Sequence, residues 1–177
     1  MFQPDVIATD RDLTVRETSI GDIVAYYRVY SNPEVAAYED FDPETSLEAS
    51  EQSVTFSMDS YMEISPVRLM FAVEVAHNGV VGFLHLIPLE RNRNARIGFH
   101  LDPAHGGQGF AYRAIDTMLC HLRDRGFHKA SALVYQENTK AVKLLTRMGF
   151  SKVEGTECPR ICKGTPVVEV LFTKELT

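Results

Sequence analysis

The residues best suited to chemistry form a glycine-rich turn between an apolar strand pattern and a helix pattern. The strand pattern covers residues 97–101 and ends at Asp102-Pro103. The turn that follows contains Gly106, Gly107 and Gly109, and the helix pattern begins directly after it. Such a turn leaves a row of backbone N–H groups at a helix N-terminus. An anion such as a pyrophosphate can bind there without a basic side chain.

Two common nucleotide-binding loops do not fit this turn. A Walker loop requires Gly-Lys-Ser/Thr, and no Lys follows Gly109. A dinucleotide-binding fingerprint requires a glycine three residues after Gly109, where Tyr112 stands. The spacing therefore argues against a phosphate-loop nucleotide hydrolase and against a dinucleotide site of the usual kind.

The elements that must position this turn alternate between strand and helix. Period-two or apolar patterns predict strands at 13–17, 69–75, 80–87, 95–101, 129–135, from 150 onward, and at 167–173. Helical spacing predicts helices at 19–30, 45–61, 111–125 and 138–148. Asn78-Gly79 is typical of a type I′ hairpin turn. The order predicts a mixed α/β fold, an antiparallel meander followed by one βαβ unit with parallel strands.

The length, hydropathy, net charge and cysteine content of the chain narrow the class of protein. A length of 177 residues is typical of a single domain, 1–177. The apolar runs are too short to cross a bilayer, so no membrane partner is expected. The net charge of −6 disfavours binding to nucleic acid. Three cysteines, at Cys120, Cys158 and Cys162, argue against a disulfide framework and for a reducing, cytoplasmic location.

The charge is unevenly distributed along the chain. Between Arg28 and Arg68 there is no Lys or Arg, although nine acidic residues lie in this interval. Most of these acids fit a solvated helix face, and some could form a surface that attracts a cationic partner.

These motifs together resemble the GNAT superfamily of acyl-CoA-dependent N-acyltransferases, and within it the branch that acetylates protein N-termini, including those of ribosomal proteins. Three segments carry the resemblance: Ile97-Gly98-Phe99 with Asp102-Pro103, His105 to Ala111, and Glu137-Asn138 through Met148-Gly149-Phe150. The resemblance implies a sheet of about seven strands with helices on both faces. It also implies acetyl transfer from acetyl-CoA to a primary amine, namely a protein N-terminus, a basic peptide or a small cationic amine.

The resemblance also implies where acetyl-CoA is held. The strand would run beside the pantetheine arm, the turn would bind the pyrophosphate, and the asparagine would contact the arm. The predicted cofactor-binding residues are Phe99, His100, Leu101, His105, Gly106, Gly107, Gln108, Gly109, Phe110, Ala111 and Asn138.

Acid–base residues are less sharply defined. Candidates for the base that receives the amine proton are His100, His85, Glu74 and Glu39, of which His100, on the strand beside the thioester, is favoured. Ala141 stands where the family commonly has a Ser proposed to protonate the departing thiolate. Tyr135 or Tyr112 could replace that Ser, and Tyr135 is the predicted acid. Glu39 and Asp40 are predicted to bind the acceptor.

A second function remains open on the sequence alone. Arg96, Arg113 and Ala141 depart from the family pattern and would suit a non-catalytic acyl-CoA sensor or partner module of the same fold. Cys158 and Cys162 have loose spacing and no nearby His, so no metal site is predicted, and a solvent-edge hairpin is the simpler interpretation. Exposed strands near the C-terminus would permit a homodimer.

Overall fold

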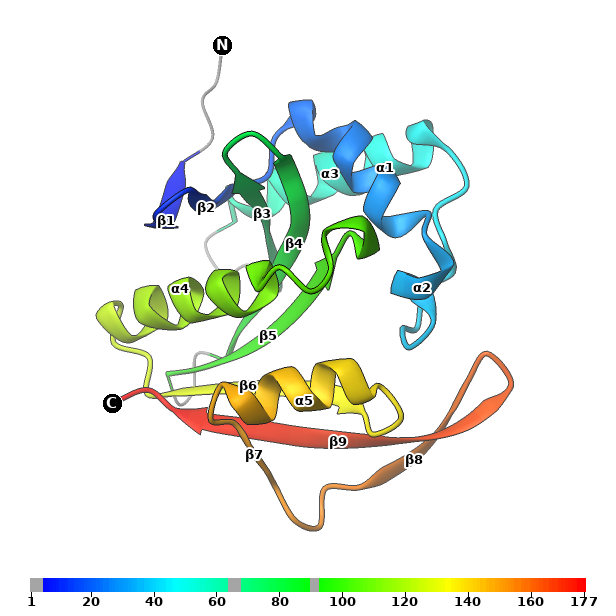
Figure 1. Cartoon of the computed structure of the whole chain (residues 1–177), viewed down its shortest axis with the longest axis vertical. Helices are drawn as coiled ribbons and strands as arrows, with labels where there is room; N and C mark the ends of the chain where they lie inside the picture. The colour runs from blue at the N-terminus through cyan, green and yellow to red at the C-terminus, as the bar shows by residue number, and fades with distance from the viewer. Residues whose placement is uncertain (1–4, 64–67, 90–92) are drawn as a thin grey trace.

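A single twisted β-sheet organises the molecule, with helices on both of its faces (Figure 1). The computed structural model describes residues 5–63, 68–89 and 93–177. The strands are β1 Val6–Asp10, β2 Leu13–Glu17, β3 Leu69–Val75, β4 Gly79–Leu89, β5 Asn94–Leu101, β6 Lys129–Tyr135, β7 Ser151–Lys152, β8 Cys158–Cys162 and β9 Thr165–Glu175. The helices are α1 Ile23–Tyr30, α2 Pro33–Ala36, α3 Leu47–Ser60, α4 Phe110–Asp124 and α5 Thr139–Arg147.

The described part of the sheet has nine strands in the order β1-β2-β3-β4-β5-β6-β9-β7, and β8 also pairs with β9. The mixed α/β class is confirmed, but the expected count of about seven strands is wrong. The additional strands are β1, which pairs with β2 at one edge, and β8. Both carry mostly exposed or half-exposed side chains and therefore lack the apolar alternation that marks a buried strand. The segment of Cys158 and Cys162 does form the expected hairpin, through β8 and β9.

The antiparallel meander from β3 to β5 is confirmed, and β2 extends it by pairing antiparallel with β3, but the predicted turn between β3 and β4 is not found. Val75 pairs with Gly79, so the loop contains three residues rather than two. The left-handed φ angles belong to His77 (69°) and Gly79 (71°). A type I′ turn centred on Asn78-Gly79 would need both of those residues at positive φ, and this prediction is wrong.

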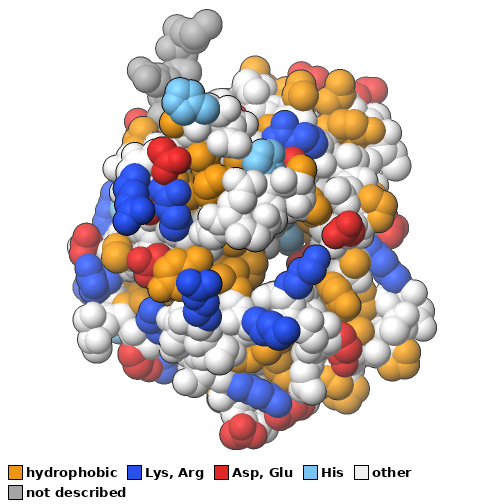
Figure 2. All heavy atoms as spheres, viewed as in Figure 1, with side chains coloured by type: hydrophobic (Ala, Val, Ile, Leu, Met, Phe, Trp, Pro, Cys, Tyr) orange, Lys and Arg blue, Asp and Glu red, His pale blue; other side chains and the backbone are white. Residues whose placement is uncertain are grey.

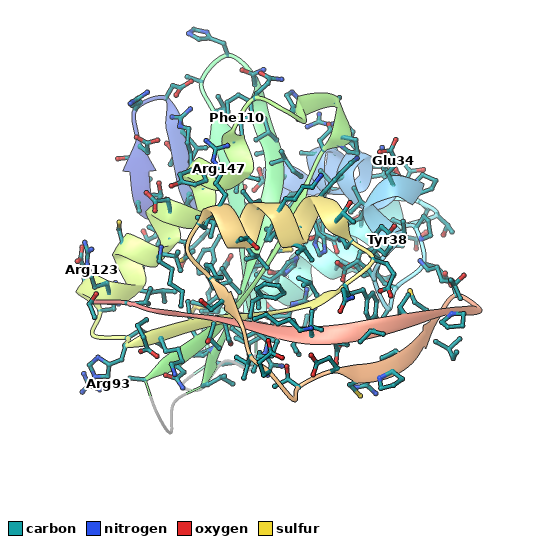
Figure 3. All side chains as sticks on the ribbon, turned by 60° about the horizontal axis from the view of Figure 1, so that its bottom comes forward. Glu34, Tyr38, Arg93, Phe110, Arg123 and Arg147 are labelled. Carbon is teal, nitrogen blue, oxygen red and sulfur yellow. The ribbon has the colours of Figure 1, made fainter. Side chains whose placement is uncertain are left out.

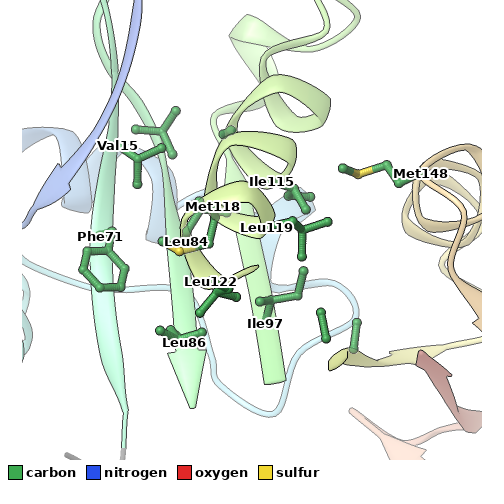
Figure 4. Packing of buried hydrophobic residues seen from close by; sticks show 14 of the residues in the cluster. Val15, Phe71, Leu84, Leu86, Ile97, Ile115, Met118, Leu119, Leu122 and Met148 are labelled. Carbon is green, nitrogen blue, oxygen red and sulfur yellow. The ribbon is translucent and has the colours of Figure 1, made fainter. Parts of the chain in front are cut away.

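Two apolar cores lie on opposite faces of the sheet. One face of the sheet packs against α4 and α5, and Figure 4 shows side chains of α4 close to those of β2 to β5. The other face of β3 and β4 packs against α1 and α3. Successive residues of β3 serve the two cores in turn, because side chains alternate across a strand: Phe71 and Val73 face α4, whereas Met70 and Ala72 face α1. β4 contributes side chains to both cores, whereas β5 contributes to the core that faces α4.

The neighbouring strands β5 and β6 separate partway along their length. They pair in parallel only where residues 94–96 meet residues 129–131. Beyond that point β5 remains paired with β4, and β6 remains paired with β9 to its end. The facing edges of residues 97–101 and 132–135 therefore present backbone polar groups to the gap rather than to each other.

Candidate active site

A cleft of about 610 Å³ lies where β5 and β6 separate. Most of its wall comes from five places in the chain: residues 97–101 of β5, residues 132–135 of β6, the α2 region from Glu34 to Asp40, the glycine turn, and the start of α5. The lining also includes Arg68, His85, Ile87, Arg96 and Glu169. The space-filling view shows an opening near the middle of one face, with Lys and Arg side chains around it (Figure 2).

The glycine turn presents a helix N-terminus to this cleft. Gly109 is the N-cap of α4 with a φ of 81°, which a residue with a side chain rarely adopts. The first helical hydrogen bond runs from the Arg113 N–H to the Gly109 carbonyl at 3.1 Å. The three N–H groups of residues 110–112 consequently have no intrahelical acceptor. The N–H groups of His105 and Gly106 already donate within the preceding turn, to Asp102 and Pro103.

The predicted cofactor-binding residues fall into two groups. Those that line the cleft are Phe99, His100, Leu101, Gly106, Gly107, Ala111 and Asn138. The other four, His105, Gln108, Gly109 and Phe110, do not line it. Phe110 points into the core with 8% of its surface exposed, so only its backbone could serve an anion.

Asn138 combines a structural task with a place on the cleft wall. Its side-chain oxygen accepts a hydrogen bond from the Ala141 N–H at 3.2 Å and so begins α5. In the first turn of α5, Lys140 lies 3.8 Å from Glu34 of α2. Figure 3 shows Glu34 and Tyr38 on the side of the molecule where α5 begins. The first turn of α5 and α2 therefore approach each other at the mouth of the cleft.

Five polar side chains form a hydrogen-bonded series that begins at the exposed Arg68, passes through the buried His85 and Tyr30, and ends at His100 and Glu39 on the cleft wall. The Arg68 Nε lies 3.1 Å from His85 Nδ1, and His85 Nε2 lies 2.6 Å from the Tyr30 hydroxyl. The hydroxyl lies 3.0 Å from His100 Nδ1, and His100 Nε2 lies 3.0 Å from a Glu39 carboxylate oxygen. Exposure rises along the last three members, from 3% for Tyr30 to 9% for the His100 side chain and 36% for that of Glu39.

Burial sets the ionisation of the inner members. It holds the pKa of His85 well below the ordinary value, aided by the nearby His100 and Arg68, so His85 is neutral at pH 7. Burial likewise raises the pKa of Tyr30 well above its ordinary value. Both side chains are therefore neutral, as their hydrogen bonds require.

A close backbone contact fixes the position of His100. Gly82 of β4 lies against β5 so closely that an added Cβ would stand 2.4 Å from the His100 carbonyl oxygen. Any side chain at position 82 would push His100 away from β4, and with it the side chain that reaches Glu39. The sequence gives no reason for this glycine.

Tyr135 is held by the segment that follows α2. Its hydroxyl donates to Asp40 at 2.9 Å. Burial, together with this hydrogen bond, raises the pKa of Tyr135 to about 12. The segment that carries Glu39 and Asp40 is fastened from the β8–β9 hairpin, because the Lys163 ammonium donates to the carbonyls of Ala36 and Phe41, each at 2.7 Å.

Several sequence candidates take other roles. Glu74 is ion-paired with Arg16 at 2.6 Å on the meander and does not line the cleft. Arg113, one of the departures from the family pattern, binds Asp10 and Asp12 and thereby ties α4 to the β1–β2 turn. Arg96 and Ala141 do line the cleft.

Two members of the polar chain have no signal in the sequence. Tyr30 falls in the apolar stripe of a helix, and Arg68 stands at the start of a strand pattern. Within residues 5–63, 68–89 and 93–177, no group of three His, Cys, Asp or Glu side chains is placed to hold a metal ion. Across those same residues, no helix is long and apolar enough to cross a membrane.

The comparisons with known proteins agree with this geometry. A family model described as "Acetyltransferase (GNAT) domain" matches residues 12–151. The uncharacterized N-acetyltransferase p20 of Bacillus licheniformis is 30% identical over 155 residues, which are 84% of this chain and 83% of that protein. The uncharacterized N-acetyltransferase YoaA of Bacillus subtilis is 28% identical over 152 residues, 83% of each chain.

Solved structures support the fold at lower identity. The RimL ribosomal alpha-N-protein acetyltransferase in complex with coenzyme A is 18% identical with a TM-score of 0.85, over 97% of this chain and 98% of that one. The spermidine N-acetyltransferase from Vibrio cholerae in complex with CoA and spermine is 23% identical with a TM-score of 0.79, over 94% and 97%.

The chain belongs to the GNAT acetyltransferase family. It is an N-acetyltransferase.

Proposed function

We propose that this enzyme acetylates the primary amine of a cationic acceptor, either a small polyamine-like amine, a basic peptide or a protein N-terminus. The observation that carries the proposal is the acidic wall of the cleft. Glu34, Glu39 and Asp40 line it from the α2 side, across from the open edge of β6. Carboxylates that line a cleft concentrate a cationic substrate and favour its approach.

The opposite wall suits the donor. We propose that the open edge of β5 at Phe99, His100 and Leu101 bonds the amides of the pantetheine arm. The N–H groups at the start of α4 would receive the pyrophosphate, because a helix N-terminus favours negative charge. Asn138 would contact the arm from α5. Acetyl-CoA supplies the activated acetyl group when it is bound.

Direct transfer then needs little from the protein beyond position and proton handling. The protein must hold the amine within reach of the donor and accept its proton. A thiol pKa of about 8.5 makes the departing thiolate tolerable without a dedicated acid. An alkylammonium has a pKa of about 10, so an acceptor of that type depends on a base more than an N-terminal α-amine with a pKa near 8 does.

The experiment that tests this is a panel of amines scored by release of free thiol. Polyamines, basic peptides and peptides with free N-termini should be acetylated, whereas neutral and acidic amines should not. Glu34→Gln and Asp40→Asn should raise the KM of the acceptor with little change in the affinity for acetyl-CoA. Asp42→Asn is the matched control, because Asp42 is an exposed neighbour that does not line this cleft. An unchanged KM in all three variants would exclude steering by these acids.

Two finer expectations accompany this proposal. We propose a cytoplasmic location, in keeping with three free cysteines among the described residues.

A homodimer stays a prediction, and analytical ultracentrifugation of the whole chain would test it. A non-catalytic role for this chain would require tight binding of acetyl-CoA with no thiol release for any amine.

A further inference from the structure

The polar chain from Arg68 to Glu39 has one consistent arrangement of protons. An arginine can only donate hydrogen bonds, and an ionised carboxylate can only accept them. Arg68 donates to His85 Nδ1, so the proton of neutral His85 is on Nε2. His85 Nε2–H then donates to the Tyr30 oxygen, at 2.6 Å. The single proton of the Tyr30 hydroxyl is left to donate to His100 Nδ1.

The outer end of the chain requires the same state of His100. Glu39 faces His100 Nε2 at 3.0 Å and needs a donor there. His100 with Nδ1 as acceptor and Nε2–H as donor satisfies both of its neighbours. The direct contact between the two histidines requires the same tautomer of His100, because His85 Nε2–H also lies 3.3 Å from His100 Nδ1. An imidazolium at His100 would place a second donor against Tyr30 and leave the Tyr30 proton without an acceptor.

This arrangement changes which group can act as the base. In this tautomer His100 has no lone pair directed into the cleft, since Nδ1 is bonded inward and Nε2 carries a proton. Glu39 still has unused acceptor positions and is the more exposed of the two groups. We propose that Glu39 receives the amine proton and that His100, Tyr30, His85 and Arg68 are positioning residues that hold its carboxylate. This rests on the proposed function only in its assignment of an ammonium acceptor.

The proton count balances for such an acceptor. The ammonium gives one proton to the Glu39 carboxylate, which passes it to solvent, and the neutral nitrogen forms the C–N bond as the C–S bond breaks. The C–S electron pair leaves with sulfur, which takes the second nitrogen proton. An ammonium and an acetyl thioester thus give an acetamide, a thiol and one free proton.

The tautomer can be measured without any substrate. Long-range ¹H–¹⁵N correlation spectra of the imidazole rings in the whole chain distinguish protonated from unprotonated nitrogens. We expect both His85 and His100 to be neutral near pH 7, with the proton on Nε2. Tyr30→Phe should weaken this preference at His100, because only the 3.3 Å contact with His85 Nε2–H and the Glu39 carboxylate then favour it, whereas Tyr26→Phe should leave it unchanged. Tyr26 is the matched control, because its ring stacks on Tyr30 but its hydroxyl takes no part in the hydrogen bonds from Arg68 to Glu39.

Activity then separates positioning from base catalysis at His100. Because a misplacement of about 1 Å can cost about 10²-fold, His100→Ala should lower kcat by about that factor. His100→Gln should recover most of the loss, because its amide N–H can replace Nε2–H toward Glu39 but cannot accept a proton. Equal losses in both variants, or a His100 observed as Nδ1–H or imidazolium near pH 7, would overturn the proposal. A failure of the amine panel would leave the spectroscopic result intact, so the two proposals fail separately.

Discussion

The two walls of the cleft are built in different ways. The donor wall uses backbone: the open edge of β5, the turn before α4 and the start of α5 all lie within residues 97–141. The proposed acceptor wall uses side chains from α1, the segment after α2, the residue before β3, β4 and β5, and it is fastened by the β8–β9 hairpin. A backbone site needs only the right local conformation, whereas a side-chain site needs several elements to be packed correctly at once.

The comparison indicates how each wall can change. The donor wall depends on the local conformation at glycines and helix starts, because the backbone groups themselves are the same in every residue. Such a wall suits a donor that does not vary. The acceptor wall depends on the identity of each side chain, so single substitutions there can alter acceptor choice while the donor is still held. The following predictions test whether the two walls are separable in this way.

The largest effect is expected from Glu39→Gln. It removes the proposed proton acceptor while keeping the shape of the side chain, so kcat should fall by about 10²–10⁴-fold. The affinity for acetyl-CoA, measured by titration calorimetry, should stay within error. Glu48→Gln, at an exposed position in the first turn of α3, is the control. A parallel loss of acetyl-CoA affinity would show that the walls are not separable.

The converse test is Gly109→Ala on the donor wall. A residue with a side chain at a φ of 81° costs roughly 1–2 kcal/mol, so acetyl-CoA binding should weaken by about tenfold if the turn shifts to relieve the strain. Gly155→Ala is the matched control, because Gly155 has a φ of 76° and open space around it in the turn between β7 and β8. Calorimetry that gives the same binding loss for both variants would contradict a specific role for the turn.

The buried histidine predicts a dependence of stability on pH. The pKa of His85 lies well below its ordinary value when the chain is folded, so below a pH of about 6.5 the unfolded chain takes up a proton that the folded chain does not. The free energy of unfolding should therefore fall as pH drops from about 7 to about 5. Replacing His85 should flatten that slope by up to about 1.4 kcal/mol per pH unit.

Denaturant unfolding at several pH values provides the measurement. His85→Asn should show the flatter slope. His77→Asn should keep the slope of the unsubstituted protein, since His77 is exposed in a turn whose positive φ suits asparagine. Parallel slopes for all three proteins would mean that His85 is already accessible to protons in the folded state.

The smallest effect is expected from Tyr135→Phe. The pKa of Tyr135 is raised to about 12, far above the value of about 8.5 for a thiol, so proton transfer from this hydroxyl to a departing thiolate runs uphill. We expect kcat to fall by less than about tenfold, against the 10²-fold or more of a true general acid. The KM of the acceptor should rise, because Asp40 loses its hydrogen bond. A loss of kcat as large as that of Glu39→Gln would restore Tyr135 as the acid.

The sequence by itself predicted the local structure of the proposed donor wall and most of the framework. The glycine spacing, the apolar stripe of α4 and the Asn138 cap are local patterns, and local patterns predict local structure. The same rules found the meander but missed β1 and β8, whose side chains are too exposed to alternate. They also misplaced the turn at Asn78-Gly79, because the pairing of Val75 with Gly79 adds one residue to the loop.

Only the tertiary structure decided the acceptor wall. Tyr30 and Arg68 are 38 positions apart in the sequence and carry no motif, yet both contact His85. Their meeting depends on the core that packs α1 and β3 against the same strand, β4. The position of the proton on His100 then follows from the groups at the two ends of the hydrogen-bonded series, Arg68 and Glu39. No local pattern encodes it, because it is a property of contacts that exist only after the fold has closed.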